Sequence, residues 1–229
     1  MRLDKFICKS TDIMRAEAIT LVREGQVRVD GKVFKNEATQ VHENNCVTID
    51  ELILTPRPSS YIMLHKPQDT ICSNVDEGYP SIFRYIDVDQ VFDLHVVGRL
   101  DVDTTGLVLV TDDGRWTYNI THPKKQCEKV YRVGLRDPIS AEAALKLEQG
   151  VQLQGVPCLT LPAKLAVVSE KEVLLTITEG RFHQVKRMFR AVGNRVVALH
   201  RQQIGGVELD IEIGQWRHLT ADEVASFTD

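Results

Sequence analysis

The stretch VVGRLDVDTTGLVLVT, residues 96–111, decides the fold and points to where function lies. Its second half, from Gly106 to Val110, is apolar and rich in β-branched residues and is followed by an Asp-Gly pair, which predicts a buried strand ending in a turn. The first half is a polar loop that carries Arg99, Asp101 and Asp103. Charged loop residues beside a rigid strand commonly hold a protein's chemistry, although loop aspartates also serve simply to cap turns.

Gly-Arg-Leu-Asp followed by Thr-x-Gly-Leu resembles the active-site motif of the pseudouridine synthases, in the branch that modifies bacterial ribosomal RNA and carries an N-terminal S4 domain. The resemblance implies that Asp101 is catalytic and that Arg99 helps to hold the RNA open. The implied reaction breaks the bond between C1′ and N1 of a uridine and rejoins the uracil through C5, after the base has been flipped out of its helix. Because the reaction is redox-neutral, no cofactor is expected.

Composition sets the broad class of the protein. With 229 residues, 43% hydrophobic and 26% charged, the chain is long enough for a good core in one or two domains. No apolar run approaches the ~20 residues that span a bilayer, and the N-terminus lacks the apolar core of a signal peptide. Five scattered cysteines indicate neither a disulfide framework nor a zinc site. We therefore expect a cytoplasmic monomer without a metal ion or a membrane partner.

The net charge of −4 hides an uneven distribution. Residues 180–207 contain no Asp or Glu, and such a basic stretch in an acidic protein indicates a polyanionic partner. The alternative is an ordinary solvated helix face. The stretch contains six basic residues, namely Arg181, Lys186, Arg187, Arg190, Arg195 and Arg201.

Residues 1–54 predict a small separate domain. Apolar spacing favours helices over residues 2–9 and 14–24, and alternation favours strands at 27–29 and 46–49. Gly25 is expected to end the second helix, and Asp30-Gly31 predicts a tight hairpin turn. The whole pattern resembles the S4 domain, whose helix pair and hairpin bind RNA phosphates. Met14 stands where that family usually has a capping Ser, so Thr11 or Asp12 is expected to cap the second helix. The residues that the resemblance assigns to RNA are Arg2, Lys5, Arg15, Arg23 and Arg28.

A proline-containing linker is predicted at residues 55–60, and the catalytic domain at 61–229. Within that domain, helices are predicted to start at Asp112 or Asp113, at Ser140, and at the capping box of residues 220–223. The strand-like run before Lys66-Pro67 resembles the first motif of the family's catalytic domain. Asp69 replaces the family's glycine there, which a left-handed backbone tolerates. We assign Lys66 to RNA binding, with a purely structural role as the alternative.

Two later motifs supply the rest of the expected site. Tyr131, on a strand predicted at residues 128–133, matches the family tyrosine that packs against the target base. The run EGRFHQVKRMF at 179–189 matches the motif whose basic residue approaches the catalytic aspartate and keeps it ionised. That residue is Lys186, with Arg187 as the alternative. Arg181, Arg187 and Arg190 are then expected to contact phosphates.

We predict an α+β protein, with a small N-terminal S4 domain before a catalytic domain whose mixed, mostly antiparallel sheet carries a central cleft. The pattern most resembles family members that act on 16S rRNA, at uridine 516, either as rRNA or in a partly assembled small subunit. A large-subunit target and a non-catalytic S4-type assembly factor remain alternatives. Asp101-x-Asp103-x-Thr105 also fits a phosphatase motif, but the strand that should directly precede that motif is interrupted.

Overall fold

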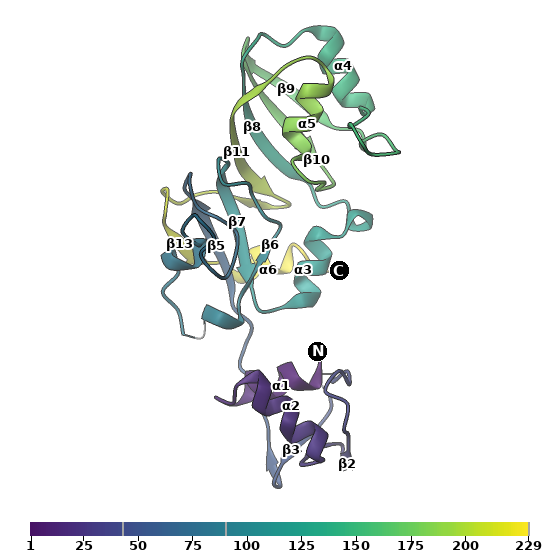
Figure 1. The fold of residues 1–229 in the computed structure, drawn as a ribbon, viewed down its shortest axis with the longest axis vertical. Helices are drawn as coiled ribbons and strands as arrows, with labels where there is room; N and C mark the ends of the chain where they lie inside the picture. The colour runs from purple at the N-terminus through teal and green to yellow at the C-terminus, as the bar shows by residue number, and fades with distance from the viewer. Residues whose placement is uncertain (43, 90, 229) are drawn as a thin grey trace. The chain divides into compact units, whose positions relative to one another are not determined.

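The computed structural model describes residues 1–42, 44–89 and 91–228. The chain divides into two compact units, Met1–Ser59 and Ser60–Asp229 (Figure 1). The division falls within the proline-containing stretch 55–60. Every helix in the described part of the chain is too short or too polar to cross a membrane.

The first unit packs two helices against a small antiparallel sheet. Helices α1 (Leu3–Ser10) and α2 (Arg15–Glu24) precede strands ordered β2-β1-β3-β4. Asp30 and Gly31 both have positive φ angles, as the predicted tight hairpin turn requires. The core is formed mainly by Leu3, Phe6, Ile7, Ala18, Val22, Val27 and Val47. The strands are β1 (Val27–Val29), β2 (Lys32–Val33), β3 (Val47–Ile49) and β4 (Leu52–Ile53).

The start of α2 differs from the sequence-based expectation. Its N-cap is Met14, which makes no side-chain capping bond, so the predicted cap by Thr11 or Asp12 is wrong. The Thr11 hydroxyl instead donates to the carbonyl of Ile7 and accepts from the Ile13 amide, so it serves the end of α1. The other end of α2 is as predicted.

The second unit is built on one mixed sheet. Its strands run in the order β13-β5-β7-β11-β8-β10-β9, with β6 beside β7 and β12 beside β11. Every pair is antiparallel except β7 with β11, which confirms the mixed, mostly antiparallel sheet. The bounds are β5 (Tyr61–Lys66), β6 (His95–Val97), β7 (Thr105–Thr111), β8 (Lys129–Leu135), β9 (Lys164–Ser169), β10 (Glu172–Ile177), β11 (Val196–Ile204), β12 (Val207–Glu208) and β13 (Trp216–His218).

Within the described residues of the second unit, four α-helices border this sheet. In Figure 1, α4 and α5 lie beside β8, β9 and β10, whereas α3 and α6 lie near β6 and β7. The predicted caps are present, because Asp113 and Ser140 accept backbone N–H groups at the starts of α3 and α4, and Thr220 with Glu223 forms a capping box. The bounds are α3 (Gly114–Thr121), α4 (Ala141–Gln149), α5 (Gln184–Ala191) and α6 (Ala221–Ala225), with short 3-10 turns at Ile82–Tyr85, Val91–Asp93 and Pro123–Lys125.

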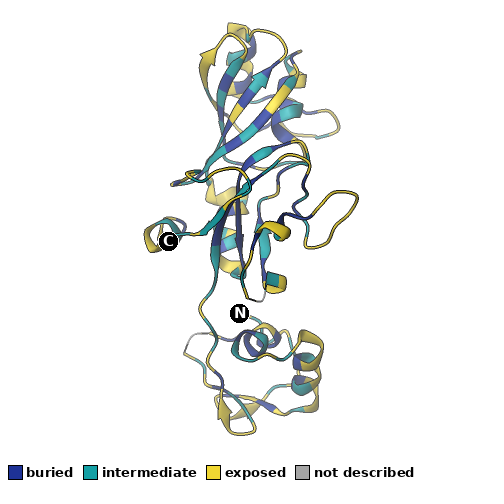
Figure 2. Ribbon diagram, turned by 90° about the vertical axis from the view of Figure 1, so that its left-hand side faces the viewer, coloured by how far each residue is buried: buried dark blue, intermediate teal, exposed yellow. Residues whose placement is uncertain are grey.

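Strand β7 is buried on both faces, as its continuous apolar run predicts (Figure 2). Leu107 and Leu109 belong to the core formed with Trp116 of α3. Val108 and Val110 belong to the larger core on the other side. The loop before β7 is therefore attached to the most rigidly packed strand of the unit.

Gly106 allows β7 and β11 to approach closely. The parallel register pairs Gly106 with Arg201 and Thr105 with His200. A Cβ atom on Gly106 would lie 2.2 Å from the Arg201 carbonyl oxygen, and the φ of +112° is itself unfavourable for other residues. Only glycine fits here, and the close approach brings β11 beneath the loop that carries Asp101.

Candidate active site

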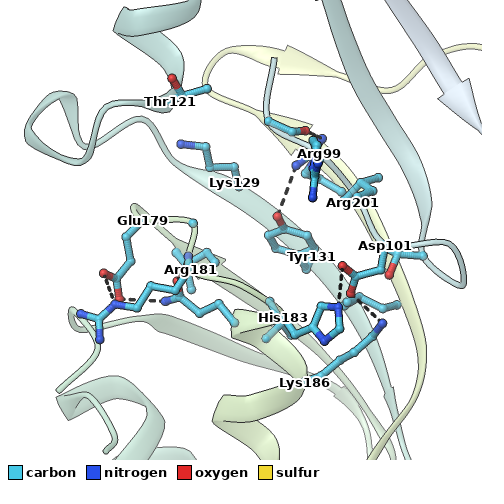
Figure 3. Close-up of a pocket in the computed structure, with 18 residues that line it drawn as sticks. Arg99, Asp101, Thr121, Lys129, Tyr131, Glu179, Arg181, His183, Lys186 and Arg201 are labelled. Carbon is cyan, nitrogen blue, oxygen red and sulfur yellow. Dashed lines mark hydrogen bonds and ion pairs between the residues drawn. The ribbon is translucent and has the colours of Figure 1, made fainter. Parts of the chain in front are cut away.

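A pocket of about 160 Å³ opens where the loop before β7 meets β8, β11 and the start of α5 (Figure 3). It is lined by side chains from segments far apart in the sequence, including Arg99, Asp101, Tyr131, Lys186 and Arg201. The first four are residues that the sequence assigns to the site. The fold therefore brings the three separate motifs together around one cavity.

Lys186 is the cation that contacts Asp101. Its Nζ donates to Asp101 Oδ2 at 2.7 Å and to Asp103 Oδ1 at 2.6 Å. Burial by itself would lower the pKa of Lys186, but hydrogen bonds and charge from both aspartates outweigh it and raise the pKa. The hydrogen bond from Lys186 likewise lowers the pKa of Asp103. The pocket thus contains an ammonium that stays charged and fixes the direction of the Asp101 carboxylate.

His183 completes the surroundings of Asp101 and was missed at the level of sequence. Its Nε2 lies 3.3 Å from Asp101 Oδ1, whereas Lys186 contacts Oδ2. The residue occupies the N-cap position of α5 with a left-handed backbone (φ +48°). Its position within the motif at 179–189 was the available signal, but nothing in that pattern reveals the unusual φ that aims the ring.

Tyr131 and Arg201 form the floor of the pocket. Tyr131 is 9% exposed and Arg201 only 3%. Arg201 donates through Nε to the Leu107 carbonyl and through Nη2 to the Gly98 carbonyl, both at 2.8 Å, and Nη1 lies 3.4 Å from the tyrosine hydroxyl. Arg201 is therefore not one of the phosphate-facing residues that its place in the basic stretch indicated. It ties the loop before β7 to the tyrosine.

The family model described as RNA pseudouridylate synthase matches residues 60–191. The chain belongs to that family. The S4 domain model matches residues 1–45, where the two helices and the hairpin lie.

Full-length relatives agree with this membership. "Ribosomal small subunit pseudouridine synthase A" of Vibrio cholerae is 50% identical over 228 residues, covering 99% of both chains. The Escherichia coli K12 protein of the same name is 46% identical over 229 residues, again covering 99% of both. Among solved structures, one titled "Crystal structure of pseudouridylate synthase" covers 100% of both chains, with a TM-score of 0.73 and 43% identity.

Within this pseudouridylate synthase, Lys66 is a correction to the sequence-based assignment. Its side chain is fully buried, and Nζ donates to the carbonyls of Pro67, Val102 and Thr104 at 2.8–3.2 Å. Burial lowers its pKa. Lys66 is enclosed by the loop that carries Asp101 and offers nothing to RNA, so the structural alternative is the one observed. Asp69 has the expected left-handed φ of +59°.

The arginines of the 179–189 motif brace the chain. Arg181 donates to Glu179 Oε2 and to two carbonyls of the 158–159 loop. Arg187 donates to the Phe182 and Gln154 carbonyls and does not approach Asp101. The structure thus separates Lys186 from its neighbour, and it shows Arg181 and Arg187 donating to carbonyls of the protein while remaining partly exposed.

Exposed cations lie around the pocket. Arg99 is exposed and lines it, while Arg190 is exposed on α5. A second hollow of about 600 Å³ lies on the Asp103 side of Lys186 and is lined by Arg136, Arg190 and Arg195. Arg136 was not expected at the site. Arg136 follows the end of β8, which pairs with the start of β11, and this pairing places it beside Arg195.

The basic residues predicted in the first unit are mostly exposed there, although several bind carboxylates. Arg2 and Arg15 both contact Asp4, and Arg23 contacts Glu37. Lys5 is exposed, and Arg28 is exposed with one bond to the Gly31 carbonyl. Nothing in this arrangement prevents the guanidinium edges of Arg15 and Arg23, 57% and 64% exposed, from meeting phosphates.

The described residues contain no group of three or more His, Cys, Asp or Glu side chains that could hold a metal ion. The two aspartates of the Asp-x-Asp pattern instead share the ammonium of Lys186. That arrangement differs from the phosphatase interpretation, in which the pair would face a magnesium ion. The polar groups here are positioned to hold a carboxylate beside an aromatic floor.

Proposed function

We propose that this chain isomerises a uridine of 16S rRNA to pseudouridine in the cytoplasm, acting as a monomer on the rRNA or on a partly assembled small subunit. The observation that carries the proposal is the Asp101 carboxylate, held at 2.7 Å by Lys186 in the same pocket as buried Tyr131. The relatives named for the small subunit support the choice of rRNA. Uridine 516 is the proposed target.

Asp101 acts on the flipped nucleotide. Its carboxylate is 29% exposed and faces the pocket, so it can reach C1′ or C6 of a uridine as a nucleophile, or stabilise charge there. The bond between C1′ and N1 breaks, and the uracil rotates so that C1′ can bond to C5. C5 then loses its proton, and N1 gains one. All atoms of the uridine are retained, and no electron donor or acceptor is consumed.

Lys186 and Tyr131 support this step in different ways. Lys186 keeps Asp101 ionised and fixes its direction, because a neighbouring cation favours the charged carboxylate. Tyr131 offers an aromatic face and a hydroxyl to the uracil, with the ring fixed by Arg201 beneath it. We assign the tyrosine to stacking on the base and to removal of the C5 proton.

Binding of the RNA relies on charge at several places. Arg99 at the pocket and Arg190 on α5 are placed for phosphates, as are the five basic residues assigned to the S4 domain. Affinity should therefore fall steeply as salt rises, because each phosphate contact releases counterions. Lys66 leaves the set because its side chain is fully buried, whereas Arg181 and Arg187 stay partly exposed and remain in it.

The deciding experiment is chemical mapping of pseudouridine after incubating wild type and the Asp101→Asn variant with small- and large-subunit rRNA and with partly assembled particles. We expect one new site in small-subunit RNA, absent with the variant. A large-subunit site would overturn the substrate and keep the reaction. Binding without modification of any RNA would favour an assembly factor and overturn the proposed catalysis.

A further inference from the structure

Phe182 is an exposed aromatic residue directly beside the reactive carboxylate. Its side chain is 72% exposed, although it lies in the turn that leads into α5. A single exposed apolar residue is ordinary on a protein surface, so exposure alone indicates nothing. What distinguishes Phe182 is its neighbour: the ring stacks on the imidazole of His183, with centroids 3.7 Å apart and planes at 21°.

The stack extends the site outward from Asp101 to His183 and then to Phe182. His183 Nε2 lies 3.3 Å from Asp101 Oδ1, so the imidazole is in contact with the carboxylate and with the phenyl ring. One face of Phe182 is covered by His183, and the high exposure of the residue leaves the other face open to solvent. An open aromatic face thus lies one ring away from Asp101.

The turn that holds the two rings is braced by several bonds. Arg187 Nη1 donates to the Phe182 carbonyl at 3.2 Å, while its Nη2 donates to the Gln154 carbonyl. The Arg187 amide also donates to the His183 carbonyl at 3.0 Å. These bonds hold His183 in a left-handed conformation that its side chain disfavours. The backbone that carries the two rings is therefore ordered before any ligand arrives, which reduces the ordering cost of binding.

We propose that the open face of Phe182 stacks on a nucleobase next to the target uridine, which makes Phe182 a substrate-positioning residue. The inference builds on the proposed function. When the uridine leaves its stack, the adjacent base loses a neighbour, and the Phe182 ring replaces it. Aromatic faces among basic residues form the usual platform for unpaired nucleic acid. Here residues 180–207 carry no acidic side chain, and the exposed Arg190 lies on α5, the helix that begins directly after the turn of Phe182.

The test compares four variants in steady-state modification of the same small-subunit RNA. Phe182→Ala should raise KM about tenfold and leave kcat within about twofold, because stacking on an aromatic ring contributes this much per base. Phe182→Trp should restore KM, and Phe182→Leu, which keeps apolar volume without a π face, should not. Phe92→Ala is the matched control, since Phe92 is 90% exposed and lies outside the pocket lining.

A fluorescence measurement tests the contact directly. The Phe182→Trp variant, combined with Asp101→Asn to prevent turnover, should show quenched emission when RNA is added. The two natural tryptophans serve as the reference, since Trp116 is 1% exposed and Trp216 is also partly buried. Asp101→Asn alone should show little change.

Three results would overturn the proposal. Wild-type KM in Phe182→Ala would remove the contact with RNA. Full rescue by Phe182→Leu would reduce Phe182 to a packing partner of His183. Loss of kcat at unchanged KM would mean that Phe182 acts on Asp101 through the imidazole. If wild type forms no pseudouridine, the proposed function fails by itself, and the Kd of Phe182→Ala for RNA still decides the stacking.

Discussion

The tripeptide Arg-Leu-Asp occurs twice in this chain, and its two copies serve opposite purposes. Residues 2–4 begin the first helix of the first unit, whereas residues 99–101 form the loop before β7 in the second. Each copy places an aspartate beside cations. The two aspartates differ in how completely their oxygens are enclosed, and that difference separates a structural carboxylate from a reactive one.

Asp4 is fully enclosed. Its side chain has no exposed surface, and its oxygens accept from the guanidinium groups of Arg2 and Arg15 and from the Lys5 amide. These donors occupy the carboxylate from several directions and tie the starts of α1 and α2 together. Such a group can stabilise a helix terminus, but a substrate atom cannot approach it.

Asp101 is held but left open. Its two contacts, Lys186 and His183, come from a segment more than 80 residues away, and 29% of its side chain remains exposed to the pocket. The surrounding fold fixes the carboxylate without occupying all of its lone pairs. The comparison shows that the same tripeptide is reactive only where the surrounding fold leaves the oxygens of its aspartate accessible to a substrate.

The largest expected effect is on Asp101. Asp101→Asn keeps the shape and the Lys186 contact but removes the charge that reacts, so turnover should fall by ~10⁴-fold or more. The free energy of unfolding should change by less than ~0.5 kcal/mol, as is usual outside packed cores. Single-turnover modification and thermal unfolding measure the two effects. A variant that retained a tenth of the wild-type rate would remove the distinction between the two aspartates.

Asp4 should show the reverse pattern. Asp4→Ala removes a fully buried acceptor that joins Arg2, Arg15 and the Lys5 amide, and losing these charge-assisted hydrogen bonds costs roughly 2–3 kcal/mol because both guanidinium groups remain open to water. Hydrogen exchange should accelerate in α1 and α2 and stay unchanged in β7. Chemical turnover of bound RNA should survive, with weaker binding. An unchanged exchange rate in α2 would mean that Asp4 does not join the two helices.

Replacing Lys66, which is bonded to the loop that carries Asp101, should have a smaller effect. Lys66→Met keeps the length of the side chain but leaves the Val102 and Thr104 carbonyls without their buried donor, at a cost of roughly 1–3 kcal/mol. We expect lower stability of the second unit together with slower turnover, because the loop loses its fixed path. Surface Lys164→Met, which removes an exposed pair with Glu128, is the matched control and should change neither.

The smallest expected effect is on the pH dependence of stability in the first unit, compared between wild type and Asp4→Asn. Burial alone would raise the pKa of Asp4, but hydrogen bonds from Arg2 and Arg15 outweigh it and hold the pKa below its ordinary value. A lowered folded-state pKa stabilises the fold at pH above about 4 and loses that effect as the pH falls through it. In Asp4→Asn, the stability of α1 and α2 should therefore depend less steeply on pH between about 5 and 2. Exchange rates in these helices across that range are the measurement.

Much of the fold could be predicted from local rules. The run at 106–110 predicted β7, and Asp113, Ser140 and Thr220 predicted three helix starts, because capping and alternation depend only on near neighbours. The cap of α2 was wrong because the Thr11 side chain found an equally local alternative in the Ile7 carbonyl.

The candidate site could be predicted less completely from local sequence patterns. Motif spacing pointed to Asp101, Tyr131 and Lys186, which line one pocket, but the motif at Lys66 and the charge of the basic stretch gave no sign that Lys66 and Arg201 are buried. Both donate to carbonyls supplied by the loop before β7 and by β7 itself, and those contacts exist only after the strands have paired. Alternation from buried Leu199 was the one available sign that Arg201 points inward.

Space at position 106 has a consequence for how this sequence can change over generations. A methyl group there would meet the Arg201 carbonyl at 2.2 Å, so no single replacement leads away from glycine through a working protein. Arg201 donates to carbonyls on both sides of that glycine, at Gly98 and Leu107, so a change at either position 106 or position 201 should disturb the other. Replacements at exposed positions away from such close contacts usually cost less stability. We therefore expect Gly106 to tolerate replacement as poorly as a reactive residue does, although it has no side chain.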